Sequence, residues 1–84
     1  MMHDRKGNIG RVLLELTPEE REVIETINSR WIGAPPERLG FVSKHRMVRE
    51  VQIWALDKPM GDLRWVKAEV LIKKLGGKNL WDPL

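Results

Sequence analysis

The chain contains no cysteine, so no disulfide can stabilise it. Its two histidines, His3 and His45, are far apart in the sequence, and neither belongs to a cluster typical of a metal site. A domain of 84 residues buries only a small core, and domains of this size often gain stability by forming oligomers. With disulfides excluded and no metal cluster in the sequence, we expect an oligomer without metal or cofactor.

Long apolar runs are also missing. No run approaches the roughly 18 residues that a membrane-spanning helix needs. Residues 1–10 are polar, unlike the apolar centre of a signal peptide. The sequence therefore predicts a cytoplasmic protein that has no contact with a membrane.

The sequence lacks the motifs of common catalytic sites. No serine or threonine stands in a nucleophile-elbow motif, and no glycine-rich phosphate loop follows a predicted strand. One acidic cluster fits the solvated face of a helix better than a pair of catalytic carboxylates, and its members are Glu19, Glu20, Glu22 and Glu25. We therefore expect a protein that is not an enzyme.

Positive charge is in slight excess and is unevenly distributed. The 15 Lys and Arg residues outnumber the 12 Asp and Glu residues, which gives a formal net charge of +3 at pH 7. Residues 18–31 are net negative, whereas residues 37–50 and 57–84 are each net positive. This distribution suits an anionic partner, although it does not require one.

One short segment, residues 11–16, has the pattern of a strand. Apolar side chains alternate at Val12, Leu14 and Leu16, which is the period of a half-buried strand. A single strand leaves its backbone groups unpaired, and even an isolated pair of strands is marginal in water. We therefore expect two chains to pair across this segment in a homodimer.

The first of three predicted helices follows this segment. Thr17 and Glu20 have the spacing of a capping box, and Pro18 stands at the first helical position. Apolar residues then recur at helical spacing, at Val23, Ile24, Ile27 and Trp31. Gly33 is expected to end this helix, and residues 36–40 to form a short turn.

Two further helices are predicted in the second half of the chain. Ser43 can cap a helix whose apolar residues keep helical spacing up to Leu56. Another helix is expected to begin after Asp62 and to end at Gly76 and Gly77. Its apolar residues cover a wide arc that we expect to be buried, and they are Leu63, Trp65, Val66, Val70, Ile72 and Leu75.

This order of strand, capped helix, turn and Ser-capped helix resembles the Arc/MetJ-type ribbon-helix-helix family of DNA-binding proteins. The resemblance covers about residues 9–56 and rests on the alternating ribbon, the Thr17–Glu20 helix start, Leu39-Gly40 and the helix that follows Ser43. It implies a mainly α homodimer, or a tetramer, in which one short N-terminal strand from each chain forms an antiparallel β-ribbon. In that family the ribbon enters the major groove of DNA.

The resemblance also implies how the chain is divided. Residues 1–10 would be a flexible basic arm, and residues 11–58 the ribbon-helix-helix core. Residues 59–84 would form a C-terminal helix and tail that are additional to the family core. This addition is a candidate site for a protein partner.

DNA contacts follow from the same resemblance. Arg11, Leu13 and Glu15 would lie on the outer face of the ribbon and contact bases, and the guanidinium of Arg11 can donate two hydrogen bonds to guanine. The start of the second helix would bind phosphate, because a helix N-terminus is an anion site. The expected phosphate contacts are Arg5, Lys6, Ser43, Lys44, His45 and Arg46. The expected dimer core consists of Val12, Leu14, Leu16, Met47, Val51 and Trp54.

Together these features predict a transcriptional repressor that binds double-stranded DNA with sequence specificity. Two alternatives stay open. In the first, a helical dimer binds a protein partner through residues 62–84 and does not contact nucleic acid. In the second, residues 11–16 are not a strand, and residues 44–56 are the groove-binding helix of a helix-turn-helix.

Overall fold

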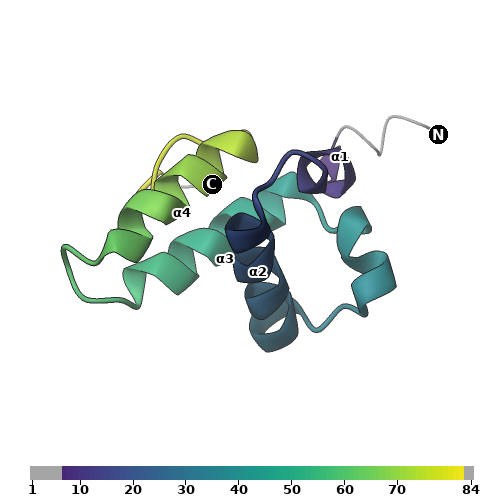
Figure 1. Cartoon of the computed structure of the whole chain (residues 1–84), viewed down its shortest axis with the longest axis horizontal. Helices are drawn as coiled ribbons and strands as arrows, with labels where there is room; N and C mark the ends of the chain where they lie inside the picture. Colours follow the sequence, from purple (N-terminus) through teal and green to yellow (C-terminus); the bar gives the residue numbers. More distant parts are fainter. Residues whose placement is uncertain (1–6, 83–84) are drawn as a thin grey trace.

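The computed structural model describes residues 7–82, which form a set of packed helices (Figure 1). Helices α3 (Lys44–Leu56) and α4 (Leu63–Lys74) lie side by side and antiparallel, and α2 (Pro18–Ile27) crosses α3. One π-helical turn, η2 (Asn28–Ile32), extends α2. Two short elements, α1 (Gly10–Leu13) and the 3₁₀ helix η3 (Pro36–Phe41), pack together near the start of α3. Within residues 7–82, no helix has both the length and the apolar character needed to cross a bilayer.

The predicted strand at residues 11–16 is wrong. The described part of the chain contains no strand or sheet, and only an isolated bridge pairs Asn8 with Ser43. Helix α1 occupies the first half of the segment, and a turn occupies the second half. The intermolecular β-ribbon, and with it the ribbon-helix-helix fold that depends on this ribbon, is therefore not present in the structure.

A helical turn is favoured here because of the spacing of three apolar residues. Ile9, Val12 and Leu16 are three and four positions apart, so a helical turn places them on one side, and all three are buried. Leu14, which would share a face with Val12 and Leu16 in a strand, is instead 81% exposed. The N–H of Ile9 also donates to the carbonyl oxygen of Val42 at 2.9 Å. The segment thus buries its apolar side within its own chain and needs no partner strand.

The three predicted helix starts are confirmed. Thr17 Oγ1 accepts a hydrogen bond from the N–H of Glu20 at 3.1 Å, and Glu20 Oε1 accepts one from the N–H of Thr17 at 2.9 Å. Ser43 caps α3 and Asp62 caps α4 through their side-chain oxygens. Gly33, at a φ of 74°, ends η2 as expected for a residue that must adopt a left-handed conformation. Each of these features depends only on residues close in the sequence.

The residues after α4 fold back against α3. Gln52, a buried residue of α3, donates from Nε2 to the carbonyl oxygens of Asn79 at 3.0 Å and Asp82 at 2.9 Å. Gly77 lies so close to α3 that a Cβ atom there would be 2.9 Å from Val48 Cγ1. These contacts place the C-terminal end of α4 beside the first turns of α3.

One side of α4 is apolar but not buried. The helix packs on α3 through Ala68, Leu71 and Ile72, which are all buried. Three further apolar residues are exposed, at 75% for Leu63, 60% for Val66 and 46% for Val70. The prediction that the whole apolar arc of α4 is buried is therefore wrong, because α3 covers only one side of it.

Candidate functional site

The start of α3 lies at one end of the molecule, near α1 (Figure 1). Ser43 Oγ accepts a hydrogen bond from the N–H of Arg46 at 3.0 Å, and the first turn contains no acidic residue. The side chains of His45 and Arg46 are exposed, and that of Lys44 is half-buried. The positive end of the helix dipole and two cationic side chains therefore share one turn, as in many anion sites.

Helix α1 is held next to this turn by backbone contacts. The hydrogen bond from Ile9 to Val42 joins the residue before α1 to the loop before α3. Gly10 approaches Gly40 closely, since a Cβ atom on Gly10 would lie 3.1 Å from the Gly40 carbonyl oxygen. Arg11 follows Gly10 and is exposed. Arg11, predicted to contact bases, is thus at the same end of the molecule as the predicted phosphate contacts of α3.

Leu13 and Glu15 are not placed on a common face with Arg11. Residues two positions apart on a helix point to different sides, so the alternation expected for a ribbon does not apply to α1. Leu13 is half-buried, and its carbonyl oxygen accepts a hydrogen bond from Arg21 Nη2 at 2.8 Å. Glu15 is exposed in the turn after α1. The two other predicted phosphate contacts, Arg5 and Lys6, lie outside the described residues.

The C-terminal end of α4 adds cations that the sequence analysis did not assign to this site. Because Gly77 packs against Val48, the last turn of α4 lies beside the start of α3. Lys73 in that turn and Lys78 after it are exposed. Lysines in a last turn are favoured by the helix dipole alone, so the sequence did not indicate that they lie near α3.

We call this region the basic end, and its members are Arg11, Arg38, Lys44, His45, Arg46, Lys73 and Lys78. Arg38 is exposed on η3, which packs on α1. Acidic residues lie on these elements or directly after them, including Glu15, Glu37, Glu50 and Glu69. Arg46 Nε is 3.9 Å from Glu50 Oε2, so part of its charge is compensated. Lys44 and Arg11 are therefore more important than Arg46 for the positive charge of the candidate site.

The six residues predicted as a dimer core lie differently from that expectation. Five are buried among the side chains of their own chain, and they are Val12, Leu16, Met47, Val51 and Trp54. Leu14 is exposed. The monomer therefore buries these five residues without a second chain.

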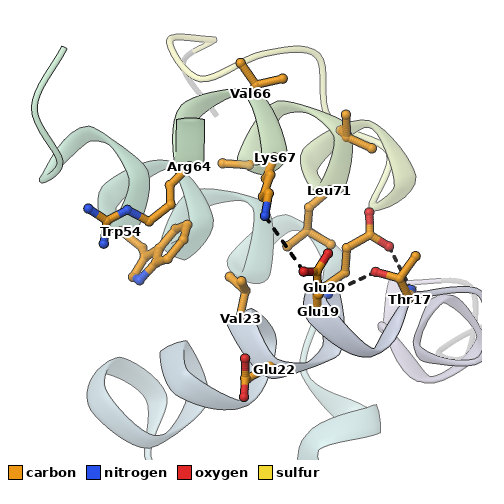
Figure 2. Close-up of a pocket in the computed structure, with 12 residues that line it drawn as sticks. Thr17, Glu19, Glu20, Glu22, Val23, Trp54, Arg64, Val66, Lys67 and Leu71 are labelled. Atoms are coloured by element: carbon orange, nitrogen blue, oxygen red, sulfur yellow. Dashed lines mark hydrogen bonds and ion pairs between the residues drawn. The ribbon is translucent and has the colours of Figure 1, made fainter. Parts of the chain in front are cut away.

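A second feature, the groove, lies between α2 and α4 and has a volume of about 380 Å³ (Figure 2). Its apolar lining includes Val23, Trp54, Val66, Ala68, Val70 and Leu71. Its charged residues are divided by element, with Glu19, Glu20 and Glu22 on α2 and Arg64 and Lys67 on α4. Lys67 Nζ is 4.0 Å from Glu19 Oε2, and this pair spans the groove (Figure 2).

Two carboxylates of the described residues have shifted pKa values, and both are helix caps. Burial alone raises the pKa of Glu20, but hydrogen bonds from Lys74 and from the Thr17 N–H outweigh it and hold that pKa below its ordinary value. Hydrogen bonds from Arg64 lower the pKa of Asp62 to about 2. Both shifts keep the carboxylates ionised, whereas a general acid near neutral pH needs a raised pKa.

Comparisons of the chain with models of protein families, with curated proteins and with solved structures find no match. Within residues 7–82, no group of three or more His, Asp or Glu side chains is placed to hold a metal ion. The candidate site is therefore argued from the geometry of this chain.

Proposed function

We propose that this protein binds double-stranded DNA through its basic end and acts in the cytoplasm as a small transcriptional repressor. The observation that carries the proposal is the position of Arg11, which backbone contacts hold beside the exposed N-terminus of α3 and Lys44. The proposal does not involve a β-ribbon.

The first turn of α3 supplies the phosphate site of this proposal. The first N–H groups of a helix have no partner within the helix. The Ser43 cap satisfies that of Arg46, and the backbone bridge of Asn8 with Ser43 lies against the same turn. The remaining N–H groups, together with the Lys44 ammonium, can donate to phosphate oxygens. Arg11 would then contact a neighbouring phosphate or the edge of a base.

The spread of the cations favours a long polyanion over a small one. The basic end draws its cations from α1, η3, α3 and the end of α4. A small anion is bound by groups that converge on one cavity, whereas a nucleic acid backbone is bound by separate contacts along its length. An extended basic surface at a helix N-terminus is typical of proteins that bind a nucleic acid backbone.

The test is the salt dependence of duplex binding, measured by fluorescence anisotropy with a labelled duplex of mixed sequence. We expect Lys44→Gln and Arg11→Gln each to weaken binding several-fold and to reduce the salt slope by about 1, because each removes one phosphate contact. Lys58→Gln is the matched control, since Lys58 follows the opposite end of α3 and loses the same charge. Equal effects in all three variants, or no binding at low salt, would contradict the proposal.

One observation favours a second candidate, a protein-interaction module that acts through residues 62–84. Leu63, Val66 and Val70 form an exposed apolar row on α4, which DNA binding does not explain. If duplex binding fails at low salt while a partner binds this row, the second candidate replaces the first.

A further inference from the structure

Leu63, Val66 and Val70 form what we call the α4 ridge. Their spacing of three and four residues is that of the contact row of a coiled coil. All three are exposed, and the side of a surface helix that faces solvent is usually polar. An exposed apolar row of this length is typical of a contact surface.

The groove lies directly beside the α4 ridge. Val66 and Val70 belong to the ridge and also line the groove, whose lining continues to Val23 and Trp54 (Figure 2). An exposed apolar row and a groove with an apolar lining are therefore adjacent on one face. Such a face can be complementary to a copy of itself.

Charges flank the groove with opposite signs. The α2 side carries Glu19 and Glu22, and the α4 side carries Arg64 and Lys67. The pair of Lys67 with Glu19 is long at 4.0 Å, and its side chains are 60% and 80% exposed. An exposed pair of this kind contributes little and can exchange partners at low cost.

We infer that this face binds a second copy of the chain, with the α4 ridge of each copy packed over the α2 side of the partner's groove. A two-fold axis parallel to the groove produces this arrangement, because it places the α4 side of one copy over the α2 side of its partner. The acidic side of each groove then meets the basic side of the other. A two-fold axis across the groove would instead bring like charges together, so the charges select the first arrangement.

The exposure of the ridge supports the same occupant. Packing Leu63, Val66 and Val70 against a copy of the chain removes their apolar surface from water, which stabilises the pair. This interface does not use the basic end. Its test can therefore be run without DNA, and its failure would leave the proposed function untouched.

The first experiment is sedimentation equilibrium of the full chain from low to high micromolar concentration. We expect a reversible dimer whose dissociation constant rises about a hundredfold or more in Val66→Glu and Val70→Glu, because a carboxylate would be buried in the apolar contact. Leu14→Glu is the matched control, since Leu14 is a more exposed apolar residue outside this face. Circular dichroism of each variant verifies that the monomer is folded.

Charge reversal provides the second measurement. Lys67→Glu and Glu22→Lys should each weaken the dimer about tenfold, and the two together should restore it. Glu22 is used because the ion pair of Lys67 within the chain is with Glu19, so restoration reports a contact between copies.

A monomer at all concentrations would overturn the inference and leave the face to another partner. A dimer unaffected by Val66→Glu would overturn it by placing the interface elsewhere.

Discussion

Lys74 Nζ lies 2.8 Å from Glu20 Oε1 and joins the last turn of α4 to the first turn of α2 across 54 positions of sequence. The same Glu20 oxygen accepts the N–H of Thr17 in the capping box. One carboxylate therefore completes a local helix cap and also fixes the position of a distant helix. Glu20 is only 13% exposed, so this pair is screened less by water than the exposed pairs of the molecule.

Glu20→Gln should make the stability of the protein less sensitive to acid. The pKa of Glu20 is lowered in the folded state, so its ionised form stabilises the fold above the ordinary pKa of 4.5. This stability is lost as the pH falls from there through the folded-state pKa. We expect the variant to lower the free energy of unfolding at neutral pH by about 1 kcal/mol and to flatten its acid dependence.

Urea denaturation at a series of pH values measures this effect. Glu25→Gln is the control, because Glu25 is an exposed residue of the same helix. If both variants lose stability with the same dependence on pH, Glu20 does not act as described.

Gly77→Ala should destabilise the contact between the end of α4 and α3. The added Cβ would lie 2.7 Å from Ile72 Cγ2 and 2.9 Å from Val48 Cγ1, so one of the packed elements must shift. Overpacking of this kind costs about 1–3 kcal/mol. Thermal denaturation provides the measurement, and Gly7→Ala is the control because no atom lies within 4 Å of its added Cβ. An unchanged melting temperature for Gly77→Ala would contradict the close approach.

Gln52→Leu should release the segment that follows α4. The substitution removes both hydrogen bonds from Nε2 and leaves the carbonyl oxygens of Asn79 and Asp82 without these donors. The expected loss of stability is about 1–3 kcal/mol. Hydrogen exchange of the Trp81 amide, which donates to Asn79 Oδ1, should accelerate more than that of the α2 amides, whereas His45→Ala, at an exposed position of α3, should leave it unchanged. Uniform acceleration would indicate global destabilisation instead.

The sequence by itself determined where α2, α3 and α4 begin and where η2 ends. The capping box of Thr17, the caps at Ser43 and Asp62 and the stop at Gly33 all depend on hydrogen bonds or dihedral angles within a few residues. The cations at the start of α3, which we propose as phosphate contacts, were predictable for the same reason, because this helix start carries Lys44 and Arg46 wherever the helix packs.

Only the tertiary structure decided the state of residues 11–16 and the surroundings of α4. The spacing of Val12, Leu14 and Leu16 suits a strand, and that of Ile9, Val12 and Leu16 suits a helix. The chain adopts the helical turn because the Ile9 N–H then donates to Val42 and the three apolar side chains join the core of the same chain. Likewise, the exposure of Val66 and the position of Lys73 beside α3 depend on which side of α4 packs against α3. Such choices are set by packing between distant segments, which the local sequence does not contain.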